Sequence, residues 1–360
     1  MCGVFGFISY GNRIKNTKKL AQELAWASTE RGMDATGVAY VQKGKIIINK
    51  KGINAYDFEF SKEIKGNPQV LMGHTRKLTQ GSAKKNYNNH PFYINTKDGR
   101  QFAFAHNGSV LNDYELRYQE DLPGTNIETD SYVVAQMLEK LGDVNYDTIR
   151  EVASKVEAYL VFTFLDEEEN IILVKGDKPL AIAHFPELKL WVYASTSEIL
   201  FNALAQFPQT AKILLKKVIG DKKARVEWIE PKLGDIIKIT KKGILEKTCF
   251  EFNDAVYDYF YKRTKTNKGK RKYLSLAYAS YSTAIPYDGY YQTLENDEFA
   301  NIVAYARNYG ITEQQLDLLR EYGYTVDEIR ELMDSGDIFS EIENVEIQER
   351  IGREMAWGRY

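Results

Sequence analysis

The sequence has few cysteines, few histidines and no long apolar segment. Two cysteines and four histidines among 360 residues exclude a disulfide framework and leave few ligands for a metal site. No apolar run approaches the ~20 residues that a transmembrane helix needs. No basic segment precedes the first apolar stretch, as it would in a secretory signal. We therefore expect a cytoplasmic protein without a membrane partner.

A charge excess of either sign is also lacking. The 48 basic and 50 acidic residues leave a formal charge of -2, which gives no general attraction to nucleic acid, so nucleic acid is not an expected partner. What the chain does contain is 44% hydrophobic residues, enough for a sizeable core. At about 100–200 residues per domain, the length predicts two domains, or one domain with an appendage.

Apolar patterns predict one α+β unit over residues 2–250. A short buried strand is expected at residues 2–9, a helix at 17–31 and four consecutive apolar strands between 159 and 196. About twelve strands with helices between them predict two sheets packed face to face with helices outside. The other expected elements are strands at 37–41, 45–49, 70–74, 102–105, 225–229 and 235–239, and helices at 129–141, 149–158 and 197–206.

The composition changes near residue 250. Residues 262–272 carry seven basic and no acidic side chains, and a Tyr-rich stretch follows, so residues 251–295 are predicted to be a linker. The basic run could instead grip an acidic partner or RNA, although a solvated linker is favoured. Residues 296–360 are predicted to form a small helical module of unknown role. Its expected helices lie at 297–309, 312–322 and 325–335, the last two opening with a capping-box spacing.

Cys2 directly follows the initiator methionine. If Met1 is removed, which the small second side chain permits, Cys2 carries both a thiol and a free α-amine. Their reference pKa values of about 8.5 and 7.7–8.0 let the neutral amine accept the thiol proton. Nucleophile and general base would then share one residue. The alternative is a buried, inert cysteine at the start of a strand.

Six short motifs occur in a fixed order. They are CGVFGF from residue 2, ERGMDATGVA at 30–39, GHTR at 73–76, NNHPF at 88–92, HNGSV at 106–110 and ETDSY at 128–132. This series resembles the class II glutamine amidotransferases, whose glutaminase domain is an N-terminal-nucleophile (Ntn) hydrolase. The resemblance covers about residues 2–250, and it implies a four-layer αββα sandwich for this domain.

The resemblance implies how the amide is attacked. Cys2 would attack the carboxamide carbon of L-glutamine and form a thioester. The oxyanion would be stabilised by the side-chain amide of Asn107 and the backbone N–H of Gly108, where a glycine lets the backbone approach the substrate closely. Alone, this Asn-Gly pair would rather predict a tight turn.

The resemblance also implies how the two charges of glutamine are bound. Arg76 would hold the α-carboxylate with its guanidinium fork, and Asp130 would hold the α-ammonium. Thr79 would assist in binding the carboxylate. The alternatives are a surface arginine, an acid at the N-terminus of a helix, and a turn hydroxyl. Arg76 and Asp130 together are more informative than either residue alone, because opposite charges on opposite walls of a pocket define an amino-acid substrate.

Arg31 and Asp34, in the RG-x-D motif, are implied to brace the floor of the site rather than to take part in the chemistry. The motif histidines His74, His90 and His106 match no general-base role in the family, so we expect hydrogen-bonded structural histidines. No cysteine or carboxylate cluster accompanies them, so neither a metal nor a cofactor is expected.

The loop after GHTR departs from the family pattern. Many members read HTRWATHG where this chain reads HTRKLTQG, so Lys77 replaces an aromatic residue and Gln80 a histidine. The sugar-phosphate and purine branches use this loop to cover glutamine and to reach the acceptor domain, so the departures argue against either branch.

No phosphate-binding loop follows residue 250. We therefore expect the ammonia acceptor on a partner synthetase, unless the enzyme hydrolyses glutamine or a related amide on its own. Two alternatives stay open: another Cys-dependent Ntn amidase that acts on an acylated amine, and a non-catalytic binding protein that retains the fold. Cys249, on a late strand, is expected to pack in the core.

Overall fold

The structure of the protein is a computed structural model. It describes residues 2–252 and, in the C-terminal part, residues 299, 306, 311–322, 324, 326–335, 338, 339, 341, 342 and 345. The chain divides into two units, residues 1–279 and residues 280–360. Beyond residues 251 and 252, the expected linker at 251–295 lies outside the described residues, so its boundaries stay predictions.

Two antiparallel sheets form the first unit. One has seven strands in the order β11-β9-β10-β1-β4-β2-β3, and the other has six in the order β13-β12-β8-β7-β6-β5. The strands are β1 Gly3–Ser9, β2 Ala35–Gln42, β3 Lys45–Lys51, β4 Val70–Arg76, β5 Phe92–Asn95, β6 Gln101–Val110, β7 Ala158–Asp166, β8 Ile171–Lys175, β9 Ala181–Phe185, β10 Leu190–Ala194, β11 Glu227–Ile229, β12 Asp235–Ile239 and β13 Leu245–Cys249.

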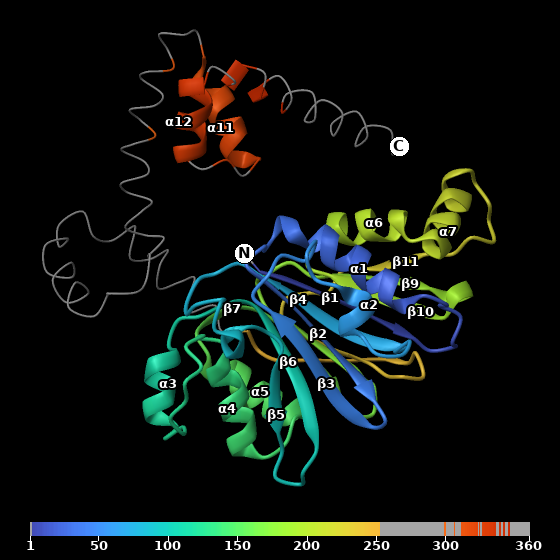
Figure 1. Ribbon diagram of the computed structural model, residues 1–360, viewed down its shortest axis with the longest axis vertical. Coiled ribbons are helices and arrows are strands. Elements are labelled where there is room, and N and C mark those ends of the chain that lie inside the picture. Colours follow the sequence, from blue (N-terminus) through green and yellow to red (C-terminus); the bar gives the residue numbers. More distant parts are fainter. Residues whose placement is uncertain are drawn as a thin grey trace, which may run out of the picture. The chain divides into compact units, whose positions relative to one another are not determined.

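Helices cover the outer face of each sheet (Figure 1). The seven-stranded sheet packs against α1 (Thr17–Ala27), α2 (Phe60–Glu63), α6 (Ser197–Gln206) and α7 (Pro208–Val218). The six-stranded sheet packs against α3 (Asp113–Gln119), α4 (Tyr132–Leu141) and α5 (Tyr146–Lys155). A third apolar cluster joins the inner faces of the two sheets. The layers therefore run helix, sheet, sheet, helix, which confirms the predicted α+β, αββα sandwich.

Strand β1 shows why its sequence is apolar throughout. Successive side chains of a strand point to opposite faces. Phe5 and Phe7 pack under the helices, whereas Val4 and Ile8 pack between the two sheets. Every residue of β1 is buried, because the strand lies inside the seven-stranded sheet with β10 on one side and β4 on the other. The first strand of the chain is thus fixed on both faces and both edges.

The expected strands are present, and the differences lie in short or half-exposed elements. β5 was not predicted, since it has only four residues that alternate between buried and exposed. α3 and α7 were also missed. The apolar residues of α7 do not all lie on its buried face, because Leu215 and Val218 face solvent. Helix α4 begins at Tyr132 rather than residue 129, and α5 spans Tyr146–Lys155 rather than 149–158.

The prediction for Cys249 was wrong. It lies on a strand, as expected, but β13 forms the edge of the six-stranded sheet and the Cys249 side chain is exposed. No residue of β13 is fully buried, and only Leu245 and Thr248 are partly buried, so neither face of this strand packs closely on the core. Cys249 and Cys2 are both free thiols.

The second unit contains α11 (Glu313–Glu321) and α12 (Val326–Ser335), which share a small apolar cluster. The capping box at Thr312 and Gln315 is confirmed, because each side chain bonds the other residue's backbone N–H. The helix expected at 297–309 lies outside the described residues apart from 299 and 306. Across the described ranges, no helix is both long and apolar enough to cross a bilayer.

Candidate active site

The predicted site residues meet at one end of the two sheets. β1 begins there, and Gly3 pairs with Thr75, one residue before the end of β4 at Arg76. β10 ends at the same place, because Phe5 pairs with Ala194. β6 of the other sheet also ends here. Antiparallel pairing therefore brings together segments that lie up to about 190 residues apart in sequence.

Cys2 is buried at this point, with 8% of its surface exposed. Its Sγ donates to the carbonyl oxygen of Lys77 (3.5 Å), and its own carbonyl accepts from Arg31 Nε (2.8 Å). Burial raises the pKa of the Cys2 thiol, while the nearby Arg76 guanidinium lowers it and the Asp130 carboxylate raises it. The thiol is therefore neutral near pH 7 and needs a base to become a nucleophile.

Asn107 is fully buried on β6 and reaches across to the seven-stranded sheet. Its Nδ2 donates to Ser195 Oγ (3.4 Å), and Ser195 Oγ also accepts from Val4 N (2.9 Å). Ser195 directly follows β10 and is itself completely buried. Asn107 Oδ1 has no hydrogen-bond partner within the described part of the chain. One hydroxyl thus ties the Asn107 amide to the strand that carries Cys2.

Gly108 occupies a position that only glycine tolerates. Its φ is +146°, and a Cβ built there would lie 1.7 Å from the carbonyl oxygen of Tyr159 on β7. Both a rarely populated backbone conformation and a direct clash with backbone therefore exclude a side chain. The sequence-based reason for glycine, close approach of the backbone, agrees with this geometry.

The backbone N–H of Gly108 faces away from β7. Its register partner Leu160 donates to Asp177 Oδ1 (2.7 Å) and accepts from Gly176 N (3.1 Å), so the pair Gly108 and Leu160 exchanges no hydrogen bonds. β5 covers the other edge of β6 only opposite residues 101–104. Val110 lies two residues after Gly108, and its N–H donates to a carboxylate at this same edge of β6. The Gly108 N–H is thus directed toward the site.

That carboxylate belongs to Asp130. Its Oδ2 accepts from Val110 N (2.6 Å), its Oδ1 accepts from Ser131 Oγ (3.4 Å), and only 4% of the residue is exposed. Burial raises the pKa of Asp130, and these hydrogen bonds and the Arg76 charge oppose that rise. Asp130 and Arg76 therefore interact electrostatically with each other and with Cys2.

Arg76 is 2% exposed at the end of β4. Its Nη1 donates to Asn89 Oδ1 (2.7 Å) and its Nη2 to the carbonyl oxygen of Gln80 (2.5 Å). Lys50 Nζ donates to the backbone carbonyl of Asn89 (2.5 Å). Burial, together with the Arg76 charge, lowers the pKa of Lys50 to about 8. Two of the five guanidinium N–H groups are thus engaged by described residues, and the others can bind a carboxylate.

Arg31 and Asp34 make the contacts expected of supports. Arg31 bonds the Cys2 carbonyl, while Asp34 N donates to Arg76 O (2.9 Å) and Asp34 Oδ2 accepts from Leu78 N (2.6 Å). Between them, Gly32 passes so close to β4 that a Cβ would lie 2.4 Å from the carbonyl carbon of Arg76. Their supporting role remains a prediction.

Thr79 and the histidines complete the predicted set. Thr79 is exposed in the loop after β4. His74 bonds the carbonyl of His106 (3.0 Å), and His106 bonds Ser131 Oγ (2.8 Å). Burial lowers the pKa of His74 to about 3 and that of His106 to about 4, so both are neutral. His90 differs from the expectation. Its ring nitrogens have no hydrogen-bond partner among the described residues, and it packs on His74 with ring centroids 4.3 Å apart.

Sequence reasoning missed the contacts made by Ser195, Asn89 and Gln80. Ser195 lies in an ordinary strand-to-helix junction, and Asn89 was noted only as part of NNHPF. Gln80 was recognised as a departure from the family, without a role. No local pattern marks such residues, because their partners are 4 to 191 positions away in sequence.

Asp113, beside Asp130, gives a test of the electrostatics of this region. Burial, together with the charge of Asp130, raises the pKa of Asp113 to about 6. In the unfolded chain the value is about 3.9, so the ionised form is disfavoured by folding and stability is lost as pH rises from about 4 to about 6. We expect Asp113→Asn to raise the free energy of unfolding by about 1–2 kcal/mol at pH 7.5.

Urea unfolding at pH 4.5 and pH 7.5 measures this effect. At pH 4.5 the gain should be much smaller, because wild-type Asp113 is then largely protonated. The exposed Asp57, changed to asparagine, is the matched control and should show no such difference between the two pH values. An equal change for Asp113→Asn at both pH values would contradict the prediction.

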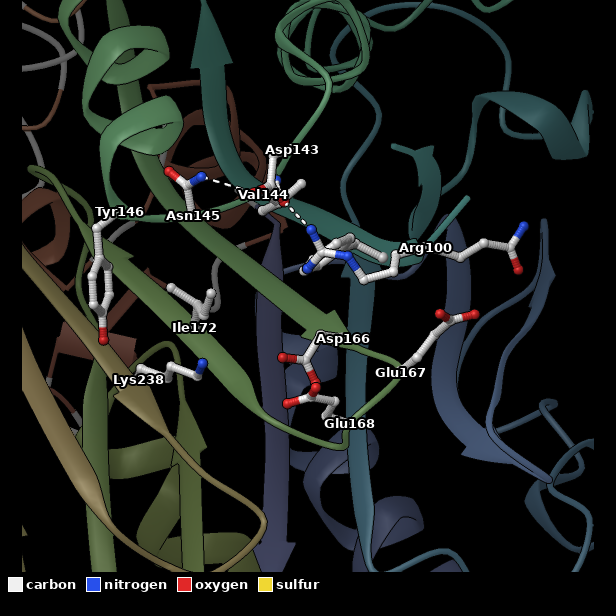
Figure 2. Close-up of a pocket in the computed structure, with 12 residues that line it drawn as sticks. Arg100, Asp143, Val144, Asn145, Tyr146, Asp166, Glu167, Glu168, Ile172 and Lys238 are labelled. Atoms are coloured by element: carbon white, nitrogen blue, oxygen red, sulfur yellow. Dashed lines mark hydrogen bonds and ion pairs between the residues drawn. The ribbon is translucent and has the colours of Figure 1, made fainter. Parts of the chain in front are cut away.

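A separate pocket of about 330 Å³ lies at the other end of β6 (Figure 2). It involves Gln101 and Phe102, about 20 Å along the strand from Asn107. Among its lining side chains, Asp143 accepts from Arg100 (2.7 Å) and from Asn145 (2.9 Å), as drawn. Within the part of the chain that is described, no group of three or more His, Cys, Asp or Glu side chains could hold a metal ion.

Comparisons with known proteins agree with the predicted family. Residues 22–192 match the family model for class-II glutamine amidotransferases. The chain is 30% identical to the isomerizing glutamine–fructose-6-phosphate aminotransferase of Fusobacterium nucleatum, over 51% of this chain and 30% of that protein. It is 32% identical to the amidophosphoribosyltransferase of Methanocaldococcus jannaschii, over 51% of this chain and 40% of that protein. The chain therefore spans well under half the length of these curated relatives.

A solved structure shares the fold. The glutamine phosphoribosylpyrophosphate amidotransferase from B. subtilis, complexed with ADP and GMP, superposes with a TM-score of 0.53 at 19% identity. The match covers 70% of this chain and 50% of that chain. At this identity the likeness concerns the fold alone.

Proposed function

The chain contains a domain of the class-II glutamine amidotransferase family, and from that premise we propose that it hydrolyses the side-chain amide of L-glutamine through a thioester on Cys2. The observation that carries the proposal is the meeting of a buried thiol with a guanidinium and a carboxylate. Cys2, Arg76 and Asp130 act on one another electrostatically, and Asn107 is tied to the same strand through Ser195.

The reaction begins when removal of Met1 frees the α-amine of Cys2. This amine takes the thiol proton, and Sγ attacks the carboxamide carbon of glutamine. Asn107 Nδ2 and the Gly108 N–H stabilise the oxyanion of the tetrahedral intermediate. The protonated α-amine of Cys2 gives its proton to the leaving nitrogen of the intermediate. Ammonia then departs, and a glutamyl thioester remains. Water, deprotonated by the same amine, then attacks the thioester and releases glutamate.

Substrate recognition follows from charge. Arg76 binds the α-carboxylate through the donors that its contacts with Asn89 and Gln80 leave available, and Thr79, from the adjoining loop, assists. Asp130 binds the α-ammonium in its ionised form. Arg31 holds the backbone of Cys2, and Asp34 holds the segment from Arg76 to Leu78, whose Lys77 carbonyl contacts Sγ. A buried pair of opposite charges fits a zwitterion better than an acylated amine that carries neither charge.

The destination of the ammonia completes the proposal. We propose that the ammonia passes to an acceptor bound by a partner synthetase. Two free cysteines agree with a cytoplasmic location.

Glutamate release from L-glutamine by the Met1-processed protein tests the function. Intact mass establishes whether Met1 has been removed. The sample is assayed alone and with proteins that co-purify from the native host. Charge-removing changes at Arg76 and Asp130 should abolish the preference for glutamine. If turnover of an acylated amine survived both changes and glutamine was not hydrolysed by any sample, the alternative amidase would replace this proposal.

Ser195→Ala should lower kcat by about tenfold and change KM by less than about twofold, because the hydroxyl acts on the oxyanion donor rather than on the ground-state substrate. The change removes the partner of Asn107 Nδ2 and leaves the N–H of Val4 without an acceptor. Steady-state kinetics with L-glutamine measures both constants.

Ser9→Ala is the matched control for this prediction. Ser9 is a buried serine at the far end of β1, and its hydroxyl has no partner among the described residues. The Ser9→Ala change should therefore leave kcat unchanged. A Ser195→Ala enzyme whose kcat equals that of Ser9→Ala would contradict the prediction.

A further inference from the structure

The two charge-binding residues come from different halves of the sandwich. Arg76 ends β4 in the seven-stranded sheet, and Asp130 precedes α4, which covers the six-stranded sheet. The distance between guanidinium and carboxylate therefore depends on the contacts that link the two halves at this end. Side chains and loops must fix that distance, because these two segments belong to different sheets and layers.

Gln80 makes such a link. Its backbone carbonyl accepts from Arg76 Nη2 (2.5 Å), and its side-chain Oε1 accepts from the backbone N–H of Asp130 (3.0 Å). One residue thus touches both predicted binders of the substrate charges. Any residue at position 80 would supply the backbone carbonyl, but the contact with Asp130 needs a side-chain acceptor of this length.

The neutral amide is suited to this position. Asp130 is 4% exposed, so without Oε1 its N–H would be a buried donor lacking an acceptor. A carboxylate would accept the same hydrogen bond, but it would add a negative charge between Arg76 and Asp130. That charge would compete with the substrate carboxylate for Arg76. Glutamine provides the acceptor and leaves the two opposite charges unchanged.

We infer that Gln80 is a specificity-determining positioning residue, which sets the separation of Arg76 and Asp130 and so selects an α-amino acid over an amide with a single charge. This inference rests on the proposed function. It adds that discrimination resides in a link between the two binders as well as in the binders themselves.

The test compares Gln80→Ala, Gln80→Met and Gln80→Glu with the wild type on two substrates. L-glutamine carries both charges, and glutaramic acid, the monoamide of glutaric acid, lacks the α-ammonium. With alanine or methionine, KM for L-glutamine should rise by about tenfold with kcat within about twofold, since one net hydrogen bond is lost. Constants for the one-charge amide should be unchanged, so the preference for L-glutamine should fall by about tenfold. Gln80→Glu should weaken the binding of both substrates.

Calorimetric binding of the product L-glutamate, compared with glutarate, which lacks only the α-ammonium, repeats the comparison without turnover. The exposed Gln119 on α3, changed to alanine, is the matched control, and thermal unfolding checks that each variant folds. An equal loss on both ligands, or no loss on either, would overturn the inference while the proposed function stood. A wild type that neither hydrolyses L-glutamine nor binds L-glutamate would overturn both.

Discussion

Replacing Cys2 by alanine is expected to lower glutamine hydrolysis by at least about 10⁴-fold. The thiol is the proposed nucleophile, and the neutral imidazoles of His74 and His106 cannot substitute for it, because their nitrogens bond carbonyl and hydroxyl oxygens in the core. Glutamate release measured with the Met1-processed proteins gives the ratio. The change removes one sulfur atom from a buried site and should leave the fold intact.

Two comparisons separate loss of chemistry from loss of structure. Cys249→Ala removes the other free thiol, which is exposed on the edge strand β13, and should retain full activity. Cys2→Ala should still bind L-glutamate with nearly wild-type affinity, because Arg76 and Asp130 are unchanged. Retention of more than a few per cent of the activity in Cys2→Ala would exclude the thioester mechanism.

Asn107→Ala should reduce kcat by about 10²–10³-fold with a much smaller change in KM, as expected for loss of one oxyanion donor. The amide is preorganised: it is fully buried, held by Ser195, and placed next to the Gly108 N–H on the same strand. Interactions that strengthen only in the transition state lower kcat when they are removed. Steady-state kinetics with L-glutamine measures the effect.

Asn107→Asp tests whether the loss comes from the missing hydrogen-bond donor rather than from the smaller side chain. It keeps the size of the side chain but replaces the donor by an acceptor of negative charge, so its kcat should fall at least as far as that of the alanine variant. The exposed Asn95 on β5, changed to alanine, is the control and should be fully active. A loss confined to KM would show that Asn107 binds the ground state and would contradict the oxyanion assignment.

Local pattern was enough to predict the layers of the fold. β1 reads as an unbroken apolar segment because both of its faces are covered, and β7 to β10 show the same property. Helix α6 was placed at Ser197–Gln206 by its apolar spacing, and Thr196 caps it through Ile199 N. The elements that were missed, such as α7 and β5, bury too few side chains to give a clear period.

The site was predictable to the extent that its residues lie in recognisable motifs. Cys2, Arg76, Asn107, Gly108 and Asp130 were named from sequence, and the structure brings them to one end of the sheets. Their roles remain predictions. The cross-links could not be foreseen in the same way, because they depend on three-dimensional distance between segments that carry no shared pattern.

The placement of β1 makes the activity of this protein a reporter of its folding. The ends of most chains fray, but here the segment that bears the thiol is an interior strand whose neighbours, β4 and β10, are contributed by Val70–Arg76 and Leu190–Ala194. A nascent or partly unfolded chain that lacks β10 cannot hold residue 2 in position. The proposed reactive centre is therefore complete only once β10 has paired with β1, and a chain without that pairing would hold its thiol outside the site.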